Sequence, residues 1–209
     1  MLKEYTLSRL DCTGVILAGG MNSRLPGKKK MFRRVGDTTM LEAIHTLFKR
    51  MFKEVILVVN DPEAFVMTDA LIVTDIDTSR CALAGLHTGL YYASHQWIYA
   101  TAGDVPFTSE AVIRHLWASR RKGKEIIIPR TREGLEPLSA LYNKTCLPRM
   151  EKSLSENRFM IKKSFNFRRV FEIPPETLER LDPEMRFKFN VNTPEDLVTA
   201  RKMAGPDQE

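Results

Sequence analysis

A glycine turn rich in cations follows the first apolar run of the sequence. Leu17, Ala18 and the Gly19-Gly20 pair end a run that begins at Thr13, and Arg24 and Lys30 follow within ten residues of the pair. Paired glycines adopt backbone conformations that other residues avoid, and they leave backbone N–H groups open to ligand oxygens. An arginine adds a planar fork of donors and a lysine a mobile point charge. This combination predicts a site for phosphate groups.

Two familiar phosphate motifs do not describe this turn. A P-loop requires four residues between its glycines, whereas six separate Gly20 from Gly27, and Lys29 stands where Ser or Thr is needed after Lys28. The dinucleotide fingerprint G-x-G-x-x-G is also absent. An ordinary strand-to-loop turn with a solvated basic face is the alternative interpretation, and the pairing of Arg24 with Lys30 argues against it.

Polar residues also follow three later apolar runs. Asn60 follows the second run, Asp75 the third, and Asp104 leaves the fourth in the sequence Gly103-Asp104-Val105-Pro106. In an open parallel sheet, ligands bind beyond the carboxyl ends of the strands. Each residue is also a common turn former. Beside a phosphate loop, however, Asp104 is predicted to bind Mg²⁺, while Asn60 and Asp75 suit a nucleobase edge or a ribose.

The order of apolar segments predicts the scaffold that brings these loops together. Strand-like runs alternate with segments of helical periodicity, which is typical of βαβ units and a mostly parallel, mixed sheet with helices on both faces. We expect strands at 15–17, 55–59, 71–74, 97–102, 125–128, 136–142 and 168–173, and helices at 40–51, 83–94, 109–121, 147–155 and 194–203. Thr39 and Thr193 are suited to cap two of the helices, and Pro174-Pro175 is expected to break the chain.

Length and composition set further limits. A chain of 209 residues suits a single domain, here 1–209 with its core at about 13–203 and loose ends at 1–11 and 205–209. No apolar segment is long enough for a bilayer and no signal peptide begins the chain, so we expect a cytoplasmic protein without membrane contact. The three cysteines, Cys12, Cys81 and Cys146, lack metal-ligand spacing and are expected to be reduced core residues.

The net charge of +6 indicates an anionic partner. The basic clusters show no regular aromatic interleaving and match no nucleic-acid-binding signature, so a nucleic-acid partner is not expected. Binding to RNA or DNA rests on net charge alone.

Six motifs together resemble the molybdenum cofactor guanylyltransferase family, within the nucleotidyltransferases of glycosyltransferase-A-like, Rossmann-like α/β fold. The resemblance spans about residues 14–203. The motifs are LAGG with Ser23-Arg24 and Gly27 to Lys30, Val58-Val59-Asn60, Leu83 to Leu86, Gly103 to Phe107, Glu136 to Tyr142, and Asn190 to Asp196. Any one of them is weak, but their order and spacing are specific.

The resemblance implies transfer of GMP from GTP to the phosphate of molybdopterin, with Mg²⁺ as cofactor and Mn²⁺ as a substitute. It also implies transient contact with molybdenum cofactor biosynthesis proteins or acceptor enzymes. Family nucleotide-contact positions match Leu17, Ala18, Gly19, Lys30, Asn60, Asp75 and Asp104, with Asp104 at the metal position, and we add Gly20 to this group. Arg24, Lys30 and Asp104 are the predicted catalytic residues.

The chain departs from the family pattern at three places. Pro26 is an insertion, Lys29 replaces an acidic residue or proline, and Cys81-Ala82 replaces Gly-Pro. A CTP-dependent or sugar-phosphate nucleotidyltransferase, and a nucleotide-binding regulatory module without transfer activity, are therefore alternative interpretations.

Overall fold

The computed structural model describes residues 8–19, 30–65 and 68–205, and in this part of the chain one mixed sheet of eight strands forms the centre of the molecule. The strand order is β10-β7-β9-β6-β1-β4-β5, with β8 paired to β7. Strand β9 runs antiparallel to both of its neighbours, whereas β6, β1, β4 and β5 are parallel to one another. The strands are β1 (Leu10–Leu17), β4 (Phe52–Val59), β5 (Leu71–Thr74), β6 (Trp97–Ala102), β7 (Ile126–Thr131), β8 (Gly134–Leu135), β9 (Ser139–Asn143) and β10 (Val170–Ile173).

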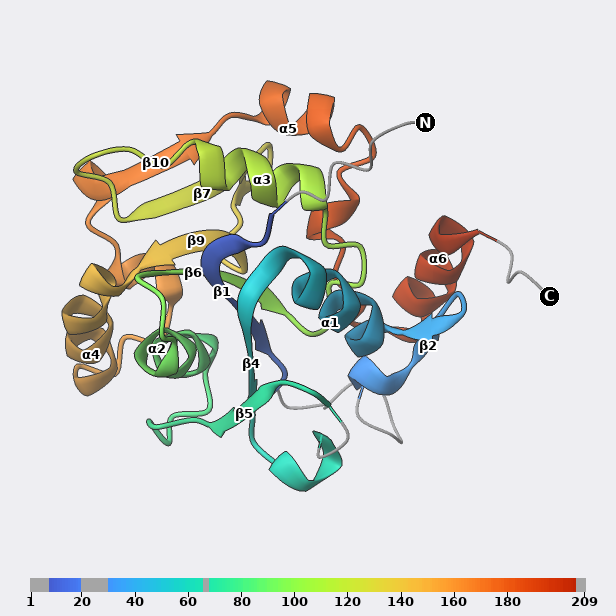
Figure 1. Ribbon diagram of the computed structural model, residues 1–209, viewed down its shortest axis with the longest axis horizontal. Coiled ribbons are helices and arrows are strands. Elements are labelled where there is room, and N and C mark those ends of the chain that lie inside the picture. Colours follow the sequence, from blue (N-terminus) through green and yellow to red (C-terminus); the bar gives the residue numbers. More distant parts are fainter. Residues whose placement is uncertain (1–7, 20–29, 66–67, 206–209) are drawn as a thin grey trace.

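Helices cover both faces of the sheet (Figure 1). The helices are α1 (Met40–Met51), α2 (Ala82–Tyr92), α3 (Glu110–Ala118), α4 (Leu147–Ser155), α5 (Pro175–Leu181) and α6 (Pro194–Ala204). Side chains of α1, α3 and α5 share one buried cluster with Ile16, and those of α2 and α4 share another with its neighbour Val15. Because successive strand residues point to opposite faces, β1 contributes to both cores. The predicted three-layer α/β fold with a mostly parallel sheet is confirmed.

Short connecting elements complete the described chain. Helix α6 packs beside a small hairpin of β2 (Arg34–Val35) and β3 (Thr38–Thr39) at one end of the molecule (Figure 1). The 3-10 helices are η1 (Lys30–Phe32), η2 (Pro62–Phe65), η3 (Lys144–Cys146), η4 (Ile161–Ser164), η5 (Phe167–Arg169) and η6 (Arg186–Lys188). Among the described residues, no helix has the length and apolar character needed to span a membrane.

Two helices begin with the caps that the sequence predicts. The Thr39 hydroxyl accepts a hydrogen bond from the Glu42 backbone, and the Glu42 carboxylate accepts one from the Thr39 backbone. Thr193 and Asp196 form the same reciprocal box at α6, with Pro194 at the first helical position. Such boxes satisfy backbone N–H groups that the first helical turn leaves unpaired. They fix where α1 and α6 start.

Several boundaries differ from the sequence predictions. Strand β1 starts at Leu10, so residues 10 and 11 belong to the sheet rather than to a loose end. The strand predicted at 136–142 is β9, which begins at Ser139, and the double proline does not simply break the chain because Pro175 occupies the first turn of α5. Proline is suited to that turn, where its missing N–H would have no helical partner.

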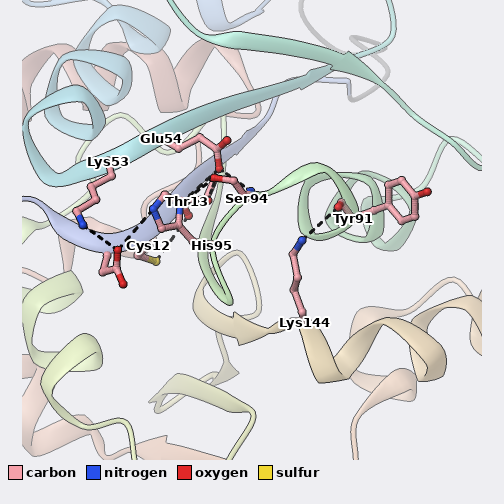
Figure 2. Close-up of polar contacts among 9 residues, drawn as sticks. Cys12, Thr13, Lys53, Glu54, Tyr91, Ser94, His95 and Lys144 are labelled. Atoms are coloured by element: carbon pink, nitrogen blue, oxygen red, sulfur yellow. Dashed lines mark hydrogen bonds and ion pairs between the residues drawn. The ribbon is translucent and has the colours of Figure 1, made fainter.

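Polar contacts hold together the amino-terminal edge of the parallel strands (Figure 2). The Glu54 carboxylate at the start of β4 accepts hydrogen bonds from the Thr13 hydroxyl at 2.5 Å and the Ser94 backbone at 2.9 Å. His95 Nδ1 lies 3.0 Å from the same hydroxyl, and Lys53 pairs with Asp11 at 2.9 Å. Burial alone would raise the pKa of Glu54, but these hydrogen bonds lower it below the ordinary value. The network fixes the edge opposite the loops that were predicted to carry chemistry.

Candidate functional site

A cavity of about 260 Å³ lies at the carboxyl edge of β1, β4, β5 and β6. Its walls also include residues from the amino-terminal turn of α2 and from helix η1, and Asn192, which lies just before the cap of α6. Among the described residues, those that line it are Leu17, Gly19, Lys30, Met31, Val58, Asp75, Arg80, Cys81, Ala82, Gly85, Ala102, Gly103, Asp104, Leu138 and Asn192. This is the edge at which open parallel sheets bind their ligands.

Lys30 and Asp104 meet in this cavity, although 74 residues separate them in the sequence. The Lys30 ammonium donates hydrogen bonds to Asp104 Oδ2 and to Asn192 Oδ1, both at 2.7 Å. The two side chains of the ion pair are 13% and 27% exposed, so solvent screens their attraction only in part. The structure therefore joins the cationic segment and the mid-chain carboxylate that the sequence singled out.

Backbone hydrogen bonds position Asp104. The Gly103 N–H donates to the Leu17 carbonyl at 2.9 Å, which ties the exit of β6 to the end of β1. The Asp104 carbonyl accepts from the Val191 N–H at 2.9 Å, which ties it to the segment before α6. Asp104 Oδ1 is buried and has no hydrogen-bond partner among the described residues. One carboxylate oxygen is thus paired with Lys30 and the other is held without a partner.

Asn192 lies in the last of the six family motifs but was not among the predicted site residues, yet it is the second acceptor for Lys30. Its backbone N–H donates to the Asp196 carboxylate at 2.8 Å, so the α6 capping box holds it in place. This hydrogen bond is the main cause of the lowered pKa of Asp196, and the positive charge of Lys30 lowers it further. The motif around Thr193 predicted a helix start, and only the fold shows that this start faces η1.

The other predicted nucleotide contacts lie along β1, β4 and β5. Leu17 and Gly19 line the cavity, whereas Ala18 is buried and its N–H donates to the Val58 carbonyl at 2.8 Å. The Asn60 amide donates to the Gly19 carbonyl, and a Cβ at position 19 would lie 3.1 Å from the Asn60 side chain. Asn60 therefore supports the wall of the cavity from behind, and glycine suits position 19 because the approach is close.

Asp75 follows β5 and faces the first turn of α2. A Cβ built on Gly85 would lie 3.6 Å from Asp75 Oδ1, which is buried and has no partner among the described residues. Burial raises the pKa of Asp75 above its ordinary value, and the negative charge of Asp77 adds to the effect. Asp75 is thus a second carboxylate with an unused acceptor, on the α2 side of the cavity.

Some of the predicted residues lie outside the described part of the chain, and the prediction for one of the three cysteines is wrong. Gly20 and Arg24 lie outside the described residues, as do the unusual Pro26 and Lys29. Cys12 and Cys146 are buried as expected, but Cys81 is not a core residue, because it lines the cavity and its sulfur caps α2 by accepting from the Ala84 N–H at 3.4 Å. The replacement of the family's Gly-Pro by Cys81-Ala82 set Cys81 apart in the sequence, but it did not indicate a place in the cavity wall.

The site has one carboxylate suited to a divalent metal beside phosphate oxygens. In the described part of the chain, no group of three or more His, Cys, Asp or Glu side chains could hold a metal ion. The partnerless Asp104 Oδ1 nevertheless fits Mg²⁺ or Mn²⁺, because Mg²⁺ is commonly held by one or two carboxylates together with water and substrate phosphates. The residues present fit a metal that arrives with a triphosphate.

Comparisons with known proteins show the family to which the chain belongs. A model of the MobA-like NTP transferase domain matches residues 14–170. The molybdenum cofactor guanylyltransferase of Desulfosudis oleivorans is 35% identical over 188 residues, which cover 90% of this chain and 93% of that protein. These matches confirm the family resemblance predicted from the sequence motifs.

Solved structures confirm the fold. Molybdopterin-guanine dinucleotide biosynthesis protein A from Archaeoglobus fulgidus superposes with a TM-score of 0.79 at 23% identity, covering 91% of this chain and 97% of that one. The Rv0371c protein of Mycobacterium tuberculosis, in complex with manganese, superposes with a TM-score of 0.60 at 19% identity, covering 93% and 100%.

Proposed function

Because the chain belongs to the MobA-like NTP transferase family, it is a nucleotidyltransferase, and we propose that it transfers GMP from GTP to the phosphate of molybdopterin with release of pyrophosphate. The observation that carries this proposal is the convergence of Lys30 and Asp104 on one cavity at the carboxyl edge of the sheet. The name of the D. oleivorans relative supports the choice of guanine nucleotide and acceptor. Transient contact with other proteins of cofactor biosynthesis, or with acceptor enzymes, is part of the same proposal.

The chemistry requires two repelling anions to be held together. The acceptor phosphate is ionised near neutral pH, so it attacks the α-phosphorus of GTP without a general base, and pyrophosphate leaves from the opposite side. The guanylyl group passes directly between the substrates, and no covalent enzyme intermediate forms. The protein therefore contributes positioning and stabilisation of negative charge.

Lys30 and Asp104 have complementary parts in this reaction. The Lys30 ammonium neutralises triphosphate oxygens, and Asn192 gives it a neutral second acceptor that keeps it at the cavity. Asp104 would hold the divalent metal through its partnerless Oδ1, and such a metal supplies Lewis-acid stabilisation of phosphoryl charge. Arg24 is proposed as a further donor to the triphosphate.

The α2 side of the cavity suits the nucleoside. The backbone at Leu17 and Gly19 lines the cavity there, and Asp75 offers acceptors for ring and exocyclic N–H groups of guanine. Asn60 holds the Gly19 carbonyl in place. Gly20 is proposed to extend this wall.

Pyrophosphate release from GTP in the presence of molybdopterin and Mg²⁺ tests the proposal. We expect the wild-type chain to release pyrophosphate with GTP and to be inactive after metal chelation, with activity restored by Mg²⁺ or Mn²⁺. Lys30→Ala and Asp104→Ala are each expected to lower turnover by about two orders of magnitude or more, as is typical when preorganised charge stabilisation is removed. Unchanged thermal unfolding would show that both variants fold.

Two controls separate this activity from its alternatives. Lys122→Ala removes an exposed lysine charge outside the cavity and is expected to leave turnover unchanged. Release with CTP in place of GTP would identify a cytidylyltransferase, and nucleotide binding without release would identify a regulatory module. Wild-type turnover by both Lys30→Ala and Asp104→Ala would overturn the assignment of the site.

A further inference from the structure

Two opposite charges line the α2 side of the cavity without pairing to each other. Arg80 and Asp75 both contribute to its wall. Among the described residues, Arg80 makes no ion pair or side-chain hydrogen bond, and Asp75 Oδ1 is buried without a partner. The cavity therefore has a donor fork and a carboxylate that are both available to a single ligand.

The turn before α2 fixes the direction in which Arg80 leaves the backbone. Arg80 has a φ of +48°, in the left-handed region that arginine rarely adopts. The residues on either side hold it there, because the Ser79 N–H donates to Asp77 at 2.9 Å and the Ser79 hydroxyl lies 3.2 Å from the Cys81 sulfur. Backbone conformations of this kind persist where surrounding contacts impose them, and they cluster at functional sites.

Guanine complements this pair of charges better than the other bases. It presents N1–H and N2–H₂ donors on one edge, which suit a carboxylate, and O6 and N7 acceptors on the adjoining edge, which suit a guanidinium. Adenine places its N6 amine where guanine has O6 and an acceptor where guanine has N1–H. Cytosine likewise carries an amine in place of the oxygen and has no N7. Uracil has a single N3–H donor beside O4 and no N7, so among the four bases guanine alone offers two donors to Asp75 and two acceptors to Arg80.

We propose that Arg80 is a specificity-determining residue that binds O6 and N7 of the guanine of GTP, opposite the contact of Asp75 with N1–H and N2–H₂. This inference rests on the proposed use of GTP. It extends that function by assigning the choice of base to the turn that precedes α2. Arg80 has no part in the phosphoryl chemistry, which belongs to the Lys30 side of the cavity.

Nucleotide binding measured by calorimetry in the presence of Mg²⁺ tests the proposal, with GTP, 7-deaza-GTP, ITP and ATP as probes. 7-deaza-GTP lacks the N7 acceptor and ITP lacks the N2 amine. The wild-type chain is expected to bind 7-deaza-GTP about tenfold more weakly than GTP, since a charged donor loses its partner. Arg80→Ala is expected to bind GTP about 10- to 100-fold more weakly and to bind GTP and 7-deaza-GTP equally.

Two further variants keep this test decisive. Arg80→Gly suits the left-handed backbone and should behave like Arg80→Ala, which removes misfolding as an explanation. Arg168→Ala removes an exposed arginine that precedes β10, at the opposite edge of the sheet, and should keep the wild-type ratios. The preference for GTP over ITP should survive in all three variants, because it depends on Asp75.

The outcomes separate this inference from the proposed function. Equal weakening of all four nucleotides by Arg80→Ala, with the wild-type preference for GTP over 7-deaza-GTP intact, would show that Arg80 binds phosphate and would overturn the inference. GMP transfer would then stand unaffected. Failure of the wild-type chain to bind GTP would instead overturn the proposed function itself.

Discussion

Two glycines on α2 provide a matched pair of substitutions with opposite expected effects on stability. Gly85 and Gly89 are both buried, one helical turn apart. A Cβ on Gly89 would lie 2.4 Å from Val15 Cγ1, far inside van der Waals contact, whereas a Cβ on Gly85 would meet Leu17 Cδ2 at 3.4 Å. Alanine is favoured over glycine in a helix by about 1 kcal/mol at either position. The difference in packing therefore decides whether each substitution stabilises or destabilises the fold.

Gly89→Ala is expected to destabilise the fold by about 2 kcal/mol. Val15 is fully buried in the central strand β1, and its β-branched side chain has little rotamer freedom with which to move away. Overpacking of this kind costs about 3 kcal/mol at its upper end, of which the helix propensity offsets about 1. For a chain of this size the melting temperature should fall by about 4 to 8 °C.

Gly85→Ala is expected to raise the melting temperature by at most about 2 to 4 °C, because its Cβ makes only ordinary contacts. The new methyl group would also lie 3.6 Å from Asp75 Oδ1 and occupy the nucleoside side of the cavity. GTP affinity should therefore fall in Gly85→Ala and stay unchanged in folded Gly89→Ala.

Thermal and urea unfolding of the two variants, with calorimetric GTP binding, check the prediction. Equal denaturant m-values would show that the variants differ in stability alone. A Gly89→Ala variant as stable as the wild-type chain would show that α2 moves freely on β1, and would refute the packing argument.

Two further perturbations test the charged groups inside the fold. The folded-state pKa of Asp75 is raised above its ordinary value of 3.8, so ionisation of Asp75 destabilises the fold as the pH rises above 3.8. Asp75→Asn should therefore melt at a higher temperature than the wild-type chain at pH 7, and the difference should shrink as the pH falls toward 3.8. A difference that stays constant across pH would contradict the raised pKa. The Glu125 side chain is 1% exposed and forms ion pairs with Arg149 and Arg169. Glu125→Ala should therefore lower the free energy of unfolding in urea by about 3 kcal/mol, whereas Arg130→Ala, which breaks an exposed pair, should lower it by less than about 1 kcal/mol. Similar losses of stability in the two variants would show that the burial of Glu125 adds nothing to the strength of its ion pairs.

The sequence predicted the parts of the fold whose signals are local and long. The helix 40–51 has apolar residues every three to four positions and a capping threonine, and the structure shows α1 with those bounds. The central parallel strands are continuous apolar runs because both of their faces are buried. The β2–β3 hairpin has two residues per strand, too few to show any periodicity. The direction of β9 depends on its neighbours β6 and β7, which its own residues do not encode.

The sequence predicted those residues of the candidate site that follow the strands of the parallel sheet. It missed the residues that reach the cavity from other segments of the chain. Loops at the carboxyl edge of a parallel sheet converge, which placed Lys30 and Asp104 together from the sequence alone. Asn192 and Arg80 reach the same cavity from a helix cap and a left-handed turn. Neither position has a side-chain pattern that separates a ligand contact from a surface polar residue.

The charges of the cavity divide it into two functional halves. Lys30 is paired with Asp104 before any substrate arrives, so these two groups of the phosphate half are already held in position. Arg80 and Asp75 balance no described side chain, so the other half gains most from a ligand that carries both donors and acceptors. Binding energy from the base can then position the triphosphate, because contacts remote from the reacting atoms supply the free energy for orientation. Arg80→Ala should consequently lower turnover at saturating GTP less than Lys30→Ala does, while raising the GTP concentration needed for half-maximal rate. Equal losses of maximal turnover in the two variants would show that the halves do not act separately.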